Sequence, residues 1–243
     1  MILSKPILKY NFADDLKHLG WIMLGVLGFN IVFGVVSMGT TNINGFELLF
    51  GLILLIGWAG HFEETLHFYA QHGVSRRTIF ANTAVGIAIS SALFTVALLL
   101  TIGLLALSAM ALPIDMGYLS VFATFYTQQL TGMGIVPGLL LHFVWAWAIL
   151  MVFSAVGQFG ASLYYILSKL GRYIALGVII FTVVFLPRLL IAVEGDLIEA
   201  FVNVIFYGGD WGRPGQAIVT ALCVAAACLI GSWLCMRRCQ MKK

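Results

Sequence analysis

The sequence predicts an all-α membrane protein that crosses the bilayer six times. Of its 243 residues 61% are apolar and only 9% are charged, and the mean hydropathy is +1.03. A soluble domain of this size could not bury so much apolar surface. A bilayer-spanning helix needs about 20 apolar residues, and six stretches qualify. They form one transmembrane domain and lie at about Leu19–Met38, Phe46–Thr65, Ile79–Leu112, Pro137–Ala155, Ile174–Val193 and Ala217–Met236.

The basic residues are distributed unevenly between the two sides of this arrangement. With the N-terminus in the cytoplasm, 11 of the 13 Lys and Arg residues fall on the cytoplasmic side, and only Arg188 and Arg213 fall outside. Cytoplasmic segments of membrane proteins carry such an excess of basic residues. We therefore expect a multi-pass protein of the plasma membrane with both termini in the cytoplasm. The net charge of +3 follows from this topology and does not indicate nucleic-acid binding.

The segment before the first span, Ser4–His18, has the pattern of an amphipathic helix. Leu8, Phe12 and Leu16 recur at helical spacing, while Lys and Asp residues occupy the other faces. A helix of this kind lies in the membrane interface and does not cross it. We predict an interfacial helix at residues 4–18 on the inner leaflet; an ordinary juxtamembrane linker is the alternative.

Three further segments depart from a simple pattern of spans. A helix over residues 79–112 would run to about 50 Å against a hydrocarbon core of about 30 Å. The third span is therefore expected to protrude, tilt or break. The outer segment Pro113–Val136 is apolar enough to rest on or dip into the membrane. The outer segment Glu194–Gly215 is amphipathic, and at membrane depth it would have to be helical to satisfy its backbone.

The most informative part of the chain is a polar island, His61–Thr78, between two apolar runs. The second span is expected to continue as helix into this island until Gly73, which supplies a left-handed C-terminal residue at no steric cost. Ser75 then caps the next helix. Arg76 and Arg77 fall in the first turn of that helix, where the macrodipole disfavours cations. Anionic lipid headgroups or acidic groups of a cytoplasmic partner could offset them.

This island ends in the string Gly-Val-Ser-Arg-Arg-Thr at residues 73–78, and it resembles the elbow of permease subunits of ABC-2-type exporters. In that family a helix on the inner leaflet precedes the first span, a coupling helix between the second and third spans docks on a separate ATPase, and re-entrant helices lie between the fifth and sixth spans. Residues 4–18, about 63–77 and 194–215 match these positions. In its compact size the chain resembles bacterial exporters of amphipathic peptides, such as phenol-soluble-modulin-type toxins. The long outer segment 113–136 departs from the family pattern.

The resemblance implies an ATP-driven exporter assembled from several chains. Two permease subunits, identical or sister chains, would flank a path for amphipathic or hydrophobic cargo, with peptides as the expected cargo. A separate cytoplasmic ATPase would bind ATP and Mg, because this chain has no GxxxxGK[ST] phosphate loop; no cofactor is expected on it. The residues assigned to ATPase docking are Glu63, Glu64, His67, His72, Gly73, Ser75, Arg76 and Arg77. The residues assigned to the cargo path are Asn30, Trp58 and Arg188.

Enzyme and carrier alternatives fit the residues less well. Glu63-Glu64 near histidines resembles CAAX-type intramembrane proteases, but Phe68 stands where those proteases have an Arg, and His142 is the only histidine on a later span. Ion-coupled carriers usually place a carboxylate near mid-membrane, whereas every carboxylate here sits at or beyond the end of a predicted span. We expect no enzymatic activity, catalytic residue or metal on this chain. A membrane immunity or partner protein without transport is the alternative, and an intramembrane protease is a less favoured one.

Overall fold

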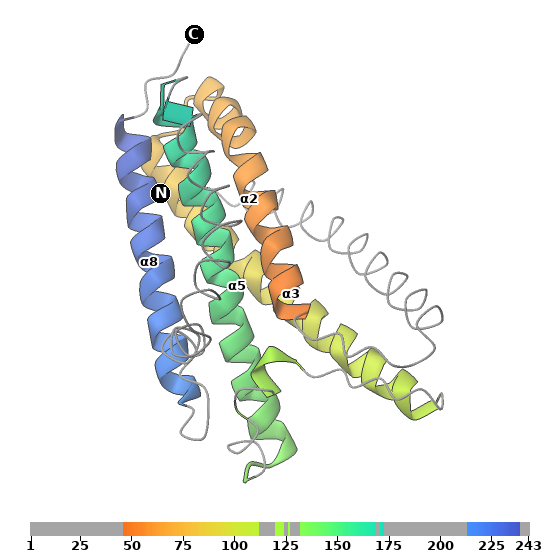
Figure 1. Cartoon of the computed structure of the whole chain (residues 1–243). Helices are drawn as coiled ribbons and strands as arrows, with labels where there is room; N and C mark the ends of the chain where they lie inside the picture. The colour runs from red at the N-terminus through yellow and green to blue at the C-terminus, as the bar shows by residue number, and fades with distance from the viewer. Residues whose placement is uncertain are drawn as a thin grey trace, which may run out of the picture.

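The structure is a computed structural model that describes residues 46–111, 120–123, 126, 132–168, 171–172 and 213–238. Within these ranges the side chains of residues 63, 64, 67, 70, 105, 106 and 108–111 are outside the description. The described residues form helices and turns with no strand among them, in agreement with the predicted all-α class. The long helices are, in chain order, α2 (Phe46–Gln71), α3 (Arg76–Ala111), α5 (Ile135–Ile166) and α8 (Pro214–Arg238) (Figure 1).

Three of these helices are long and apolar enough to cross a membrane. They are Arg76–Leu104 within α3, with 29 residues, Ile135–Ile166, with 32, and Pro214–Arg238, with 25. In α2 the apolar part is shorter and covers Phe46–Phe62. Helices of this length and composition indicate a membrane-embedded protein. They overlap the spans predicted at 79–112, 137–155 and 217–236.

α3 is one continuous helix of 36 residues. At a rise of 1.5 Å per residue it is about 54 Å long, well beyond a hydrocarbon core of about 30 Å. Of the three outcomes expected for this long apolar run, a break is therefore wrong. Protrusion and tilt both stay compatible with the observed helix.

α5 lies at the centre of the bundle. It packs most extensively against α8 and α2 and less extensively against α3. α2, α5 and α8 run in the same direction, and α3 runs against them (Figure 1). The turn between α2 and α3 therefore lies at the same end as the last turns of α5 and α8. We call this the elbow end; the far end is the one where α2, α5 and α8 begin.

Small residues let α5 and α8 approach their neighbours closely. A Cβ added to Gly157 of α5 would collide with the backbone carbonyl oxygen of Leu55 on α2. On α8, Ala217, Ala221 and Ala225 are buried along one face, as their four-residue spacing predicts. Between apolar helices in a membrane, van der Waals contact at such positions is a main source of packing energy.

Hydroxyl groups connect the helices inside this packing. The Oγ atoms of Ser162 on α5 and Ser232 on α8 lie 2.7 Å apart, and those of Ser91 on α3 and Ser154 on α5 lie 3.2 Å apart. The Ser162 hydroxyl donates to the Gln158 carbonyl at 2.7 Å, so it accepts from Ser232. These buried hydroxyls are paired, which avoids the cost of an unsatisfied polar group in apolar surroundings.

The buried apolar side chains form two clusters, one toward each end of the bundle. The far cluster is rich in aromatic rings, among them Phe50, Phe94, Phe122, Tyr126 and Trp145. The elbow cluster is smaller and comprises Phe62, Leu66, Tyr69, Ile79 and Met236, with Val74 and Phe80 packed against it. Each cluster supports a group of polar residues at its own end of the bundle.

Basic side chains concentrate at the elbow end. Five described arginines occur there, at the start of α3, just beyond α5 and at the end of α8, namely Arg76, Arg77, Arg172, Arg237 and Arg238. Among the described Lys and Arg residues, Arg213 alone stands at the far end. The two ends of the described bundle thus differ in charge, as the sequence predicted for the two sides of the membrane.

Several predictions from the sequence lie outside the described residues. These are the interfacial helix at 4–18, the spans at 19–38 and 174–193, and residues 194–212 of the outer segment before the last span. Of the outer segment 113–136, only residues 120–123, 126 and 132–136 are described. All of these stay predictions.

Candidate functional site

The end of the polar island forms a tight turn between α2 and α3, and we call residues 72–77 the elbow. α2 ends at Gln71, and Gly73 adopts the predicted left-handed conformation with φ +70°. The Val74 amide donates to the Tyr69 carbonyl at 3.0 Å, which is the 6→1 bond of a Schellman cap. Val74 also packs against the elbow cluster, to which Tyr69 belongs. The turn itself thus satisfies a carbonyl in the last turn of α2.

His72 adds a second contact at the end of α2. Its Nδ1 lies 2.7 Å from the Phe68 carbonyl oxygen, which can only accept a hydrogen bond, so Nδ1 carries the proton. The imidazole also lies on the Phe68 ring, with 4.4 Å between the centroids. A histidine side chain just beyond a helix can hydrogen-bond its last carbonyls. Its exposed side chain is therefore held in one position at the surface of the elbow.

Ser75 caps α3, as the sequence predicts. The backbone amide of Thr78 donates to Ser75 Oγ at 3.3 Å, and the two hydroxyl oxygens lie 2.9 Å apart. The Ile79 amide donates to the Ser75 carbonyl at 3.0 Å and begins the helical ladder. An N-cap serine typically contributes about 1 kcal/mol to helix stability. With caps on both sides, the four residues between the helices have a defined shape.

Arg76 connects the elbow to the end of α8. Its Nη1 donates to the carbonyl oxygens of Met236 at 3.3 Å and of Arg237 at 3.0 Å. These carbonyls belong to the last turn of α8, where orphan acceptors and the helix dipole favour a cation. The unfavourable place of Arg76 at the start of α3 is therefore offset within the chain, and this residue needs no lipid headgroup or acidic partner. Its neighbour Arg77 is exposed.

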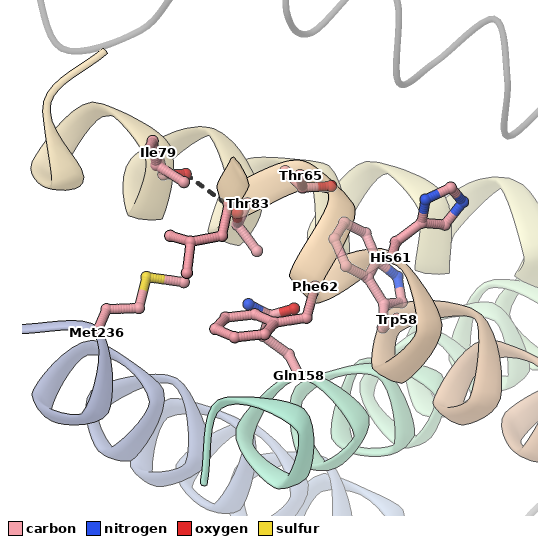
Figure 2. A pocket seen from close by; sticks show the side chains of 9 residues that line it. Trp58, His61, Phe62, Thr65, Ile79, Thr83, Gln158 and Met236 are labelled. Atoms are coloured by element: carbon pink, nitrogen blue, oxygen red, sulfur yellow. Dashed lines mark hydrogen bonds between the residues drawn. The ribbon is translucent and has the colours of Figure 1, made fainter. Parts of the chain in front are cut away.

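A small cavity lies beneath the elbow, between α2, α3, α5 and α8 (Figure 2). Its volume is about 10 Å³, room for one water molecule at most. Polar groups on its wall include Gln158, which is buried, and Thr83, whose hydroxyl donates to the Ile79 carbonyl at 3.0 Å. An organic ligand does not fit in this space. The described part of the elbow end therefore offers a packed surface for contact with another molecule.

The predicted docking residues fall into two groups. One group lies in the turn and at the start of α3, and it comprises His72, Gly73, Ser75, Arg76 and Arg77. The other group lies on α2 before the turn, and it comprises Glu63, Glu64 and His67. The side chains of this second group are outside the description, so the structure gives only their place on the helix. Docking of a partner on either group stays a prediction.

Of the predicted cargo-path residues, only Trp58 lies within the described ranges. Its Nε1 donates to Ser90 Oγ on α3 at 3.3 Å, and its ring lies close to Gly86 of the same helix. Trp58 thus holds α2 against α3 and also lines the small cavity under the elbow (Figure 2). Asn30 and Arg188 lie outside the described residues. A role of these three residues in a cargo path stays a prediction.

A second polar group lies at the far end, where a buried acid meets a histidine. Glu47, in the first turn of α2, is 1% exposed, and His142 of α5 is 13% exposed. Nε2 of His142 lies 3.5 Å from Oε1 of Glu47. Neither carboxylate oxygen accepts a hydrogen bond from a described residue. A buried ionised carboxylate needs a compensating cation, and the imidazole and the N-terminal dipole of α2 are the compensating groups in the described site.

Aromatic rings enclose this pair. Phe122 stacks on the His142 imidazole, with 4.7 Å between the centroids and 10° between the planes. Phe122 also contacts Tyr126 and Trp145. Burial raises the pKa of Tyr126 to about 12, partly countered by a hydrogen bond with Trp145, so this phenol is neutral at physiological pH. Glu47 and His142 are therefore the charge-bearing groups among the described residues of the far cluster.

An open cavity of about 290 Å³ reaches the same histidine. Its volume is close to the lower limit of about 300 Å³ for small-ligand pockets. Its walls come from residues 122–123 and the start of α5, and they comprise Phe122, Ala123, Met133, Gly134, Ile135, Gly138, Leu139 and His142. His142 is the ionisable residue among them, and Glu47 is buried next to it. The far end thus combines a cavity with a buried carboxyl group that accepts no hydrogen bond from a described residue.

The sequence gives little sign of this second group. Glu47 falls among the acids predicted for the outer side, and His142 is an isolated polar residue within another span. Only the packing of α2 on α5 brings the two together. Glu47 lies in the first turn of α2, at the end of a span, as the sequence predicted for the carboxylates. Its burial was not predicted.

The described side chains contain no group of three His, Cys, Asp or Glu residues placed to hold a metal ion. Comparison of the chain with protein families, with characterised proteins and with solved structures gives no match. The function therefore has to be argued from the geometry of the elbow and of the far end.

Proposed function

We propose that this chain is the permease subunit of an ATP-driven exporter of the ABC-2 type. It moves amphipathic or hydrophobic cargo, foremost peptides, out of the cell. A separate cytoplasmic ATPase binds ATP and Mg and docks on the elbow, and a second permease subunit, identical or a sister chain, completes the path. The chain itself catalyses no reaction. It crosses the plasma membrane six times, with both termini in the cytoplasm.

The observation that carries this proposal is the connection between the elbow and α8. Caps at Gly73 and Ser75 give the turn a fixed shape, and Arg76 bonds it to the last carbonyls of α8. A displacement of the elbow would therefore act on α2, α3 and α8 together. A coupling element needs this stiffness, because a flexible loop would absorb the motion of the ATPase before it reached the spans.

The positive charge of the elbow end supports both a cytoplasmic location of this end and its contact with the ATPase. Its five described arginines agree with a cytoplasmic location by the positive-inside rule. The exposed side chains of Arg77 and His72 are available to acidic groups on a docking partner. A plain solvated loop would also satisfy the positive-inside rule, but it would need neither the two caps nor the bonds from Arg76.

The proposal is tested by purifying the tagged chain from its native membranes and measuring the ATPase that accompanies it. An ATP-binding-cassette subunit, identified by mass spectrometry, is expected to co-purify together with ATP hydrolysis. Arg77→Glu should lower its recovery about tenfold or more, because like charges facing each other in an interface are strongly unfavourable. Arg76 is left intact, since it holds α8.

Arg238→Glu is the matched control for this experiment. It makes the same charge change at the same end of the bundle, at another exposed arginine that lies outside the elbow. Recovery of the ATPase should stay within about twofold of the unmodified chain, because single exposed charges away from an interface contribute little. Absence of any ATPase from the unmodified preparation would contradict the exporter, and equal losses in both variants would contradict docking on the elbow.

A further inference from the structure

The open cavity at the far end takes no part in the docking proposed above. We propose that it binds an amphipathic cation, an ammonium or guanidinium group on an apolar body, and that Glu47 balances the charge of this ligand. The inference rests on the far end alone and does not depend on the transport function.

The size and lining of the cavity determine which ligand body can fit in it. Its volume of about 290 Å³ suits one aromatic or aliphatic body with a small head group. Phe122, Met133, Ile135 and Leu139 give it apolar walls. Such walls favour the body of an amphipathic molecule over a fully hydrated ion. Among the described lining residues, His142 has the polar side chain.

The charge of Glu47 sets a further requirement for the ligand. Its carboxylate is 1% exposed and accepts no hydrogen bond from a described donor, so an isolated negative charge there would be strongly unfavourable. The pair is neutral when the carboxylate is protonated, or when the imidazole carries the proton instead. It is also neutral when both are unprotonated and a cation occupies the cavity. The third state is the one that binds ligand.

His142 links the cavity to the carboxylate. The imidazole lines the cavity and lies 3.5 Å from Glu47, so it connects a ligand in the cavity with the buried carboxylate, which is not among the described lining residues. The exchange balances: one cation enters, one proton leaves the pair for solvent, and the charge of the site stays constant. Protons and cations therefore compete for the same carboxylate.

Other ionisable groups near the pair do not supply this charge. In the described part of the far end, α3 contributes no ionisable side chain to the far cluster. The phenol of Tyr126 is neutral, and Arg213, before the start of α8, is exposed. Among the described residues of the far end, Glu47 is thus the acidic group to which a cation in the cavity would respond.

A purely structural role for Glu47 explains fewer of the observations. An acid in the first turn of a helix normally accepts from the free amides there, yet neither oxygen of Glu47 does so. A structural pair would also require no cavity open at His142. The binding site accounts for both features.

The test uses the full chain in lipid nanodiscs, with empty nanodiscs subtracted. The probe is benzyltrimethylammonium, whose charge is permanent, and neopentylbenzene is its uncharged isostere. Equilibrium dialysis at about pH 8 should show saturable binding of the cation. Lowering the pH should weaken it, because a proton and the cation compete for the same carboxylate. Binding of the neutral isostere should not change with pH.

Glu47→Gln should lower the affinity for the cation about tenfold or more and leave that for the neutral isostere within about twofold, since only the charge is removed. His142→Gln keeps the carboxylate and replaces the imidazole by an uncharged amide, so its affinity for the cation should fall less than that of Glu47→Gln. Equal losses in both variants, or an unmodified chain that binds the cation no better than empty nanodiscs do, would overturn the proposal.

A second measurement covers the case in which Glu47→Gln does not fold. Calorimetric titration of the unmodified chain with benzyltrimethylammonium, in two buffers of different ionisation enthalpy at about pH 6, counts the protons released. Net proton release on cation binding supports the exchange. Binding without proton release at this pH overturns it.

Discussion

At the elbow end the polar groups that shape the turn are bonded within the chain, whereas at the far end a buried carboxylate has one histidine as its close partner. Val74, Ser75 and Arg76 each make hydrogen bonds that close the turn or fix it to α8. Oε1 of Glu47 lies 3.5 Å from Nε2 of His142, and the carboxylate accepts no hydrogen bond from a described residue. The two ends also differ in cavity volume: the cavity at the elbow end has about 10 Å³ and the cavity at the far end about 290 Å³.

The difference separates two ways of building a functional surface. A network whose members all have partners is rigid, and it suits a contact that must transmit force. A buried charge with incomplete compensation next to open space suits a ligand, because the ligand supplies what the fold leaves out. The elbow is therefore interpreted as a docking surface and the far end as a binding pocket. Four substitutions, each paired with a control substitution, test this contrast, from the largest expected effect to the smallest.

His142→Leu should have the largest effect on stability. It leaves the buried Glu47 carboxyl without its close polar partner, and an unsatisfied buried polar group costs about 1–3 kcal/mol of unfolding free energy, or more when it is charged. Adding Glu47→Gln should recover most of the loss, because the remaining amide carries no charge. Unfolding by SDS titration in mixed micelles measures both variants.

The matched substitution at the elbow is His72→Leu. The side chain of His72 is exposed and bonds one carbonyl of its own helix, so its removal should cost far less. Similar losses for the two histidine variants would mean that the two ends do not differ electrostatically.

Gly157→Ala tests the helix contact that lies between the two ends. The new Cβ would meet the Leu55 carbonyl oxygen, a backbone atom that cannot rotate away, and overpacking of this kind costs about 1–3 kcal/mol. Gly160→Ala is the control on the same helix, because nothing lies within 4 Å of its Cβ position. It should be neutral or stabilise the chain by up to about 1 kcal/mol through helix propensity. The same unfolding titration serves for both.

Arg76→Ala should cost about 1 kcal/mol, because it removes charge-assisted hydrogen bonds at a partly exposed position. Hydrogen exchange should rise in the last turn of α8, because its carbonyl oxygens lose the hydrogen bonds that Arg76 donates. Arg77→Ala, at the exposed neighbouring position, should change stability by less than about 0.5 kcal/mol. If both variants leave exchange in α8 unchanged, the elbow does not hold that helix.

Gly73→Ala should have the smallest effect, about 1 kcal/mol or less, because alanine is strained at φ +70° although the space around it is open. Gly60→Ala within α2 also meets no atom within 4 Å and should be neutral or slightly stabilising. Thermal unfolding in detergent resolves the two. A stabilising Gly73→Ala would contradict the Schellman cap.

Particular residues show how far sequence reasoning reached. The end of α2 before Gly73 and the cap at Ser75 were predictable, because each depends on the conformational preference of one residue and its immediate neighbours. The site at Glu47 and His142 was not predictable, since each residue alone is an ordinary polar group near a span end. For Trp58 the sequence suggested a cargo path, while the structure shows a bond to Ser90 between two helices.

The sequence by itself determined the apolar helices, the capped elbow and the concentration of arginines at one end, because hydropathy, capping and charge act over short stretches of chain. Only the tertiary structure decided that Arg76 bonds the end of α8 and that Glu47 is buried beside His142. These contacts join residues far apart in sequence. They depend on the depth and rotation at which α2, α5 and α8 pack, which side-chain shape along whole helix faces sets.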